Sequence, residues 1–111
     1  MSRPDALAAA DPAPIFAALG DPTRLALLSR LADGRSRSIS TLSAGGVLTR
    51  QAVTKHLHVL ETAGLVHKLR VGRESRFAYR PEPLDAARSY LDAVSAQWDQ
   101  ALGRLRDLVE A

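Results

Sequence analysis

The chain has 111 residues, of which 46% are hydrophobic and 24% are charged. This length suits one domain with a single core, and the composition is typical of a globular protein rather than a disordered one. The chain has no cysteine, which excludes a disulfide framework, a thiolate metal site and a cysteine nucleophile.

Residues 1–12 are rich in alanine, proline and aspartate and have no periodic pattern, so we expect a flexible tail there. They lack the continuous apolar stretch of a secretory signal. No apolar run in the chain approaches the ~20 residues that cross a bilayer. We therefore expect a cytoplasmic protein without a membrane partner, whose single domain covers residues 13–111.

Two helices are predicted at the start of this domain. The first covers residues 13–19, whose apolar side chains fall on one stripe, and Gly20 ends it. Asp21 then provides an N-cap and Pro22 the first residue of a second helix, because proline loses only an amide that has no partner at that position. The second helix extends to about residue 32, so the domain opens with a helical pair.

A polar segment and two more helices follow. Residues 35–40 are predicted as either a short strand or a loop, and residues 41–44 as a short helix before a glycine turn. Thr49 caps the next helix, which extends through residue 63, and Gly64 occupies its C′ position. A short helix, a turn and a longer helix are the order of a helix-turn-helix unit.

A β-hairpin is predicted after these helices. Its first strand covers residues 65–71 and its second strand residues 76–80, with a polar turn over 72–75. Every second residue of the first strand belongs to one set, which consists of Leu65, His67, Leu69 and Val71. The positions between them are more polar, except for Val66. Two prolines then end the hairpin.

The last predicted helix extends from Leu84 to Val109 and has an unbroken heptad pattern. It spans about 40 Å, which is longer than the core of so small a domain can cover. We expect the excess to pack against the same helix of a second subunit; a helix folded back over its own domain is the alternative. The expected dimerisation residues, three of them in the first helix, are Ile15, Phe16, Leu19, Leu84, Leu91, Val94, Trp98, Leu105 and Leu108.

The basic residues are concentrated in the middle of the chain. Residues 35–80 contain nine lysines or arginines and two glutamates, a net charge of +7. The remaining residues contain six lysines or arginines and ten acidic residues, a net charge of −4. This split predicts one surface for a polyanion and another that does not touch it. A solvated basic face is the alternative explanation of the charge alone.

The helix over residues 49–63 has an exposed face suited to a major groove, opposite the buried stripe of Val53, Leu57 and Leu60. Its side chains can hydrogen-bond base edges. We predict that the residues that read bases or flank them are Arg50, Gln51, Thr54, Lys55 and His58. The residues predicted to contact phosphates or the minor groove are Thr49, Arg70, Arg73 and Arg76.

Three segments resemble the ArsR family of repressors. Residues 15–25 (IFAALGDPTRL) are similar to the opening of that family. Residues 49–57 (TRQAVTKHL) and 59–66 (VLETAGLV) resemble its recognition helix and the exit into its wing, and Gly72-Arg73 fits the wing tip. The match is close over residues 13–80 and only general in the last helix. The resemblance implies a dimeric winged-helix repressor that leaves DNA when a signal arrives.

Many members of this family sense metals, but the corresponding residues are different here. The family's thiolate pair lies in the short helix before the recognition helix, and residues 38–43 (SISTLS) contain no cysteine. A second family site uses histidine and carboxylates on the last helix, which here has aspartates but no histidine. His56 is expected to bond a backbone carbonyl, and His67 to be a strand residue. We therefore expect no metal site and no cofactor.

These features predict a protein that is mainly α with a small β-hairpin wing, an α+β winged helix-turn-helix fold that dimerises through its long C-terminal helix. The predicted function is a sequence-specific repressor, with its own gene among its candidate targets. Two-fold symmetry predicts an inverted-repeat operator whose half-sites lie about one helical turn apart, or a multiple of it.

An enzyme is not expected, because the sequence has no nucleophile elbow, glycine-rich phosphate loop or paired carboxylates in an apolar setting. Two other functions fit the same sequence. One is a metal-responsive repressor with carboxylate and histidine ligands. The other is a winged-helix protein-interaction module that does not bind DNA.

Overall fold

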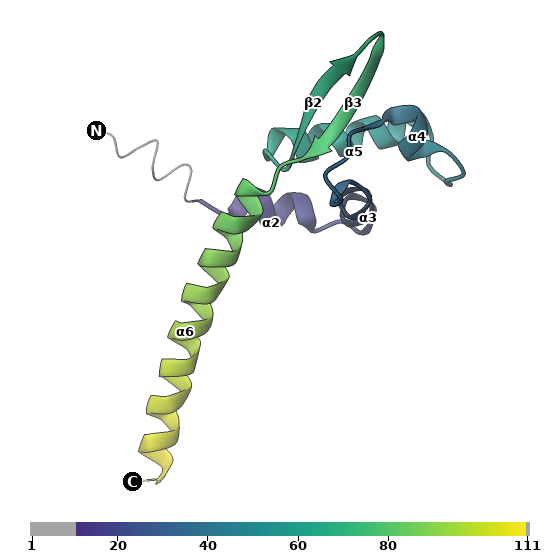
Figure 1. Cartoon of the computed structure of the whole chain (residues 1–111). Coiled ribbons are helices and arrows are strands. Elements are labelled where there is room, and N and C mark those ends of the chain that lie inside the picture. Colours follow the sequence, from purple (N-terminus) through teal and green to yellow (C-terminus); the bar gives the residue numbers. More distant parts are fainter. Residues whose placement is uncertain (1–10, 111) are drawn as a thin grey trace.

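The computed structural model describes residues 11–110, which form a helical domain with a small sheet and one projecting helix (Figure 1). Residues 1–10 of the expected tail lie outside the described residues. The elements, in chain order, are α2 (Ala13–Leu19), α3 (Pro22–Leu31), β1 (Arg37–Ser38), α4 (Ile39–Ser43), α5 (Arg50–Thr62), β2 (Val66–Val71), β3 (Glu74–Tyr79) and α6 (Glu82–Glu110).

Helices α2 and α3 have the predicted boundaries, and local capping explains why. Pro12 is the N-cap residue of α2. The side chain of Asp21 accepts a hydrogen bond from the backbone N–H of Arg24 at 3.0 Å and so caps α3, while Pro22 begins that helix. The last two residues of the expected tail, Asp11 and Pro12, therefore belong to the start of the helical domain.

Helix α5 also begins and ends where the sequence predicted. The hydroxyl of Thr49 accepts from the N–H of Ala52 at 3.1 Å. At the other end Gly64 has a φ of +81°, which a residue with a Cβ rarely adopts. The N–H groups of Gly64 and Leu65 donate to the carbonyls of Glu61 and Leu60, which is the Schellman arrangement. The glycine therefore turns the chain directly from α5 into the hairpin.

Helix α4 begins two residues earlier than predicted. We expected residues 41–44, but Ser38 is the N-cap and its hydroxyl accepts from the N–H of Thr41 at 3.1 Å. The helix consequently covers Ile39–Ser43. Ser38 is buried at the edge of the sheet and pairs with Arg76 of β3, so the strand β1 leads directly into α4.

The sheet has the strand order β1-β3-β2, with all neighbours antiparallel. The segment left open as strand or loop forms β1, which pairs with β3. The predicted four-residue turn over 72–75 was wrong: only Gly72 and Arg73 form the turn, and Val71 pairs with Glu74. Gly72 has a φ of +63°, as the first position of a type II′ turn requires, so the hairpin closes with two residues.

The hairpin packs on the domain only at its base. Val66 and Phe77 are buried, whereas Val71, near the tip, is 47% exposed. His67 is an exposed strand residue, as predicted. Of the alternating set in the sequence prediction, only Leu65, which precedes β2, is buried in the core. The members within β2 lie on the face that the helices do not cover.

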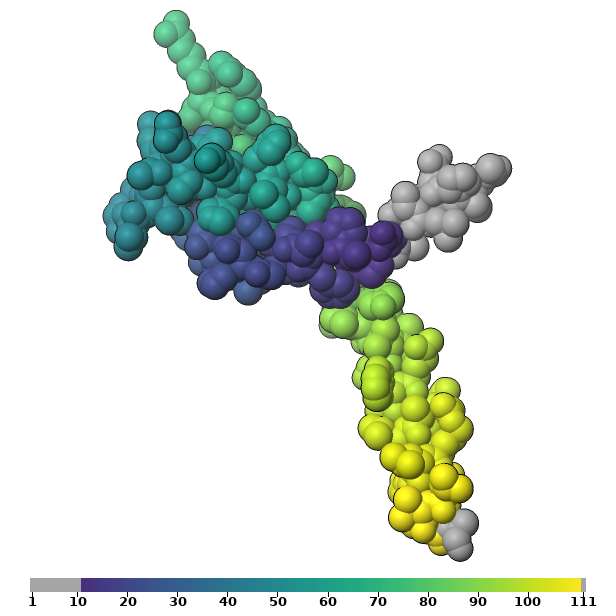
Figure 2. All heavy atoms as spheres, turned by 180° about the vertical axis from the view of Figure 1, so that it is seen from behind, coloured from purple at the N-terminus to yellow at the C-terminus, as the bar shows by residue number. Residues whose placement is uncertain are grey.

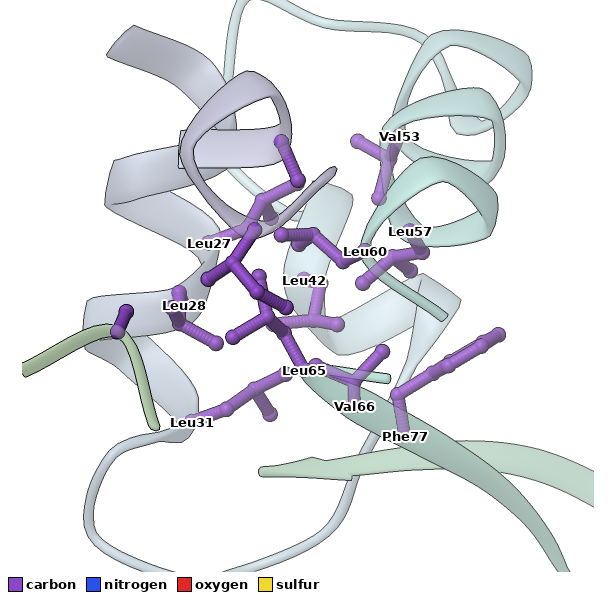
Figure 3. Close-up of a cluster of buried hydrophobic side chains, with 13 residues drawn as sticks. Leu27, Leu28, Leu31, Leu42, Val53, Leu57, Leu60, Leu65, Val66 and Phe77 are labelled. Atoms are coloured by element: carbon purple, nitrogen blue, oxygen red, sulfur yellow. The ribbon is translucent and has the colours of Figure 1, made fainter. Parts of the chain in front are cut away.

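One hydrophobic core lies between α3, α5 and the base of the sheet (Figure 3). The predicted stripe of α5 is buried in it, with Val53, Leu57 and Leu60 almost inaccessible. Burying each such leucine contributes about 1.5–3 kcal/mol. This packing fixes which face of α5 remains outside.

Helix α6 leaves the domain and projects away from it (Figures 1 and 2). Its 29 residues span about 43 Å, and only Ala87 is buried. Pro83 lies in the first turn, where its missing amide costs no hydrogen bond, so the helix begins two residues before the predicted Leu84. The alternative that this helix folds back over its own domain is wrong. Within residues 11–110, no helix has the length and apolar character that a membrane span needs.

Candidate nucleic-acid interface

The outer face of α5 presents four of the predicted base-reading side chains together. Arg50, Gln51, Thr54 and Lys55 line one shallow hollow in the first half of the helix. Val53, Leu57 and Leu60 anchor the opposite side of the helix in the core. The rigid core therefore holds these polar side chains outward, as a reading surface requires.

The two threonines at this end of α5 differ in what their hydroxyls can still do. Thr54 donates its hydroxyl hydrogen to the carbonyl of Arg50 at 2.7 Å, so its methyl group remains the main feature for contact. Thr49 uses its oxygen as an acceptor for the N–H of Ala52, which leaves the hydroxyl hydrogen for another acceptor. Thr49 is therefore suited to a phosphate and Thr54 to a thymine methyl.

The wing tip lies close to the N-terminal end of α5. Arg73 and Arg50 line one hollow of about 480 Å³, together with Ser40 of α4 and with Glu74 and Ser75 of β3. Arg70 pairs with Ser75 across the hairpin and therefore shares its face. The structure thus places Arg70, Arg73 and the reading face of α5 around one polar surface.

Arg76 is not part of this surface. It follows Ser75 by one residue, so its side chain leaves the other face of the sheet. Its Nε also donates to Glu74 at 2.9 Å. Within residues 11–110, Arg50, Lys55, Arg70 and Arg73 make no salt bridge, whereas Arg76 does.

His58 lies at the far end of the reading face from the wing. Its side chain is highly exposed, and its Nδ1 is 3.8 Å from a carboxylate oxygen of Glu61. It also borders a hollow between α5 and α2. It therefore lies at the edge of the face that presents Gln51 and Lys55.

The predicted environment of His56 was wrong. No carbonyl bonds it among the described residues; its Nδ1 lies 3.3 Å from Nη1 of Arg24 and 3.8 Å from Oδ2 of Asp21. The reason is that this flank of α5 faces the N-terminal end of α3, where side chains rather than backbone groups are presented. Arg24 lies in the family-like segment of residues 15–25, but no role was predicted for it.

A second arginine of α3 was also missed. Arg30 donates from Nη1 to the carbonyl of Leu42 at 2.8 Å and from Nη2 to that of Thr41 at 3.2 Å. These carbonyls lie near the end of α4, where that of Thr41 also accepts from the N–H of the C-cap residue Ala44 at 3.3 Å. Arg30 therefore fixes the short helix α4, which precedes α5. The sequence shows Arg30 only as a basic residue of the preceding helix α3, and no local pattern indicates its contacts.

One pair of charges lies apart from the polar surface. Arg37 donates to both carboxylate oxygens of Asp33, at 2.7 and 2.9 Å. This hydrogen bonding holds the pKa of Asp33 well below its usual range and raises the pKa of Arg37. Arg37 is therefore neutralised locally, and part of the basic charge of residues 35–80 is structural.

Within residues 11–110, no group of three or more histidine, aspartate and glutamate side chains is arranged to hold a metal ion. The aspartates of α6 lie along the projecting helix, apart from the three histidines.

Comparison with known proteins shows the family. Residues 19–68 match the family described as "Helix-turn-helix domain". The chain is 40% identical over 76 residues to the HTH-type transcriptional regulator YuzN of Bacillus subtilis, covering 63% of this chain and 83% of YuzN. An ArsR-like transcriptional regulator from Rhodococcus sp. RHA1 has a TM-score of 0.77 and 36% identity, covering 87% of this chain and 91% of that one.

A third protein is more distant. Mb0332 from Mycobacterium bovis, described as a homodimeric winged helix-turn-helix DNA-binding domain and a possible ArsR-family regulator, is 26% identical. Its TM-score is 0.61, and the match covers 87% of each chain. YuzN and the Rhodococcus protein are named as transcriptional regulators, which confirms that this chain is not an enzyme. The chain belongs to the ArsR family of winged helix-turn-helix transcriptional regulators.

Proposed function

We propose that this regulator binds an inverted-repeat operator in double-stranded DNA as a homodimer and represses transcription there, in the cytoplasm. Residues 13–111, with Asp11 and Pro12 at the start of α2, would bind DNA and dimerise. The observation that carries the proposal is the polar surface shared by α5 and the wing tip. Four cationic side chains make no salt bridge there among the described residues, and the one carboxylate that lines its hollow, Glu74, is bonded to Arg76. Such a surface matches the phosphates and base edges of a major groove.

The proposed base contacts come from the first half of α5. Gln51 can bond adenine with both ends of its amide, and Arg50 or Lys55 can donate to guanine. Thr54 offers its methyl group to thymine, and His58 flanks the site. Because these residues lie on a helix fixed by the core, they can reach base edges without rearrangement of the domain.

The proposed backbone contacts surround that face. Thr49 can donate to a phosphate oxygen at the N-terminal end of α5, and Arg70 and Arg73 can extend the contact along the wing. Arg76 is proposed as a weaker contact, because it would first have to leave Glu74. The hairpin would thus position the protein, while α5 reads the sequence.

The proposed homodimer rests on the exposed apolar side of α6. Leu91, Trp98, Leu105 and Leu108 are each more than half exposed in the single chain. A soluble protein rarely leaves such a continuous stripe uncovered. Val94 is half-buried on this helix. Ile15 lies in the chain's own core, and Phe16, Leu19 and Leu84 pack against that core. The homodimeric state of Mb0332 supports the same assembly.

A gel-shift experiment with the DNA upstream of the protein's own gene tests this function. We expect a retarded complex that survives excess non-specific DNA, and a footprint with two-fold symmetry. Transcription from the bound promoter should fall when the protein is added. No retardation at low salt, on this DNA or on duplexes selected from a random-sequence pool, would overturn the proposal in favour of a protein-interaction module.

A further inference from the structure

Arg24 lies in a gap between α2 and the recognition helix α5. The two helices face each other across a hollow of about 420 Å³ that Arg24 also lines. The other residues around it come from α2 and its start on one side and from the second half of α5 on the other: Pro14, Ala17, Ala18, His58, Val59, Thr62 and Ala63. A side chain that spans such a gap can set the distance between two helices that do not fill it themselves.

The guanidinium of Arg24 bonds to both sides of the gap. On the side of α2, Nε donates to the carbonyl of Ala18 at 2.6 Å and Nη2 to that of Ala17 at 3.3 Å. These carbonyls lie at the C-terminal end of α2, where a cation is favoured. On the side of α5, Nη1 lies 3.3 Å from Nδ1 of His56. Because a guanidinium only donates, Nδ1 of His56 is the acceptor in this contact.

Asp21 completes this cluster. Its carboxylate accepts from the backbone N–H of Arg24 at 3.0 Å, and the same oxygen lies 3.8 Å from Nδ1 of His56. The hydrogen bond from the Arg24 N–H is the main reason that the pKa of Asp21 is lowered. The N-cap that begins α3 therefore also fixes the backbone from which Arg24 extends.

The cluster connects the DNA side of the molecule with the projecting helix. Phe16 of α2 packs against Tyr90 of α6 in a tilted arrangement, with ring centroids 6.1 Å apart. The next residues of α2, Ala17 and Ala18, are those whose carbonyls bind Arg24. A continuous path of contacts thus leads from α6 through α2 and Arg24 to His56 on α5.

We propose that Arg24 is a positioning residue for DNA recognition, which holds α5 at a fixed place relative to α2 through His56 while touching no DNA itself. The inference rests on the proposed DNA-binding function. It also gives the family-like segment of residues 15–25 a physical role: its helix end, its N-cap and its arginine together determine where the recognition helix lies.

The test compares specific and non-specific affinity, because a positioning residue affects them differently. Arg24→Met keeps much of the side-chain volume and removes the donors. Affinity for a duplex selected by the wild-type protein should fall about tenfold, with little change on a scrambled duplex. The slope of log affinity against log salt should stay the same, since no phosphate contact is lost. Loss of folded protein would lower both affinities together.

Variants at His56 make the coupling measurable. His56→Phe should give a loss similar to that of Arg24→Met, and the double variant should be no worse than either single one, because both remove the same link. His56→Asn retains an acceptor near the position of Nδ1 and should restore most of the specific affinity. Arg88→Met, which removes an exposed arginine from α6, is the control for the lost charge.

Each outcome decides the proposal. It is supported if the ratio of specific to non-specific affinity falls in both single variants, with a non-additive double variant. It is overturned if Arg24→Met keeps that ratio, if the two losses add, or if the salt slope falls as for a phosphate contact. If the wild-type protein selects no duplex at all, the proposed DNA-binding function fails, and that result is visible before any variant is compared.

Discussion

The domain and the projecting helix α6 use apolar residues in opposite ways. In the domain, α5 buries its stripe against α3 and the sheet, and Leu57 has no exposed surface. In α6 the stripe is equally regular, yet Trp98 is 64% exposed and Leu108 75%. The same periodicity therefore belongs to a stripe that is buried within the chain in one region and to a stripe that is exposed to solvent in the other. Only the second region needs another molecule to exclude water from its apolar side.

The charges divide along the same line. Unpaired cations gather at α5 and the wing tip, whereas carboxylates outnumber basic residues along α6. A dimer formed through α6 keeps its acidic surface away from the phosphates, so one end of the molecule can associate while the other binds DNA.

The largest change in free energy is expected from Leu57→Ala in the buried core of the domain. It should lower the free energy of unfolding by about 2–5 kcal/mol, because the cavity lies between helices and cannot collapse fully. Urea unfolding followed by circular dichroism measures this. Val59→Ala on the same helix is the control, since Val59 is 40% exposed, and its loss should be below about 1 kcal/mol. Equal losses would mean that α5 is not anchored as described.

Trp98→Ala tests the exposed apolar stripe of α6, which is proposed to form the dimer. The dimer should weaken by about 2 kcal/mol, or roughly 30-fold in dissociation constant, because a large aromatic side chain at the centre of the stripe loses its burial. Sedimentation equilibrium measures this, and Gln100→Ala nearby is the control. If the variant instead leaves the association unchanged, α6 does not pair through this face.

Local signals predicted most of the fold. Asp21 with Pro22, Thr49 and Gly64 fix helix ends through bonds to neighbouring residues, so the sequence indicates them directly. The pairing register of β2 and β3 was harder to predict, because the first residues of β3 are all polar and do not alternate with apolar ones. A shift of one residue moves a side chain to the other face, and the position of Arg76 depends on this.

The cluster around Arg24 was beyond local signals. Its partner His56 is 32 residues away, and the two meet only because α3 and α5 pack side by side. The burial of Ile15 in its own core is of the same kind. An apolar stripe on a short helix does not indicate whether the helix packs against its own chain or against a partner subunit.

Gln51→Ala tests the reading face of α5. Discrimination at one base pair should fall by about 1–3 kcal/mol, with other positions unaffected, because the variant removes a bidentate contact to one base. Competition among duplexes that differ at single positions measures this. Gln100→Ala on α6 should leave every position unchanged. A uniform loss across all sequences would place Gln51 against the backbone instead.

The smallest effect is expected on DNA affinity and its salt dependence, where Arg73→Ala and Arg76→Ala compare the two faces of the wing. Arg73 lies at the tip beside Arg50 and is unpaired, so its removal should weaken all sequences alike and reduce the salt slope by about 0.9. Arg76 faces the other way and is bonded to Glu74, so its removal should change the slope much less. Affinities measured across a range of salt concentrations decide between them. Equal slopes for both variants would mean that the hairpin binds DNA along its edge rather than through the face it shares with α5.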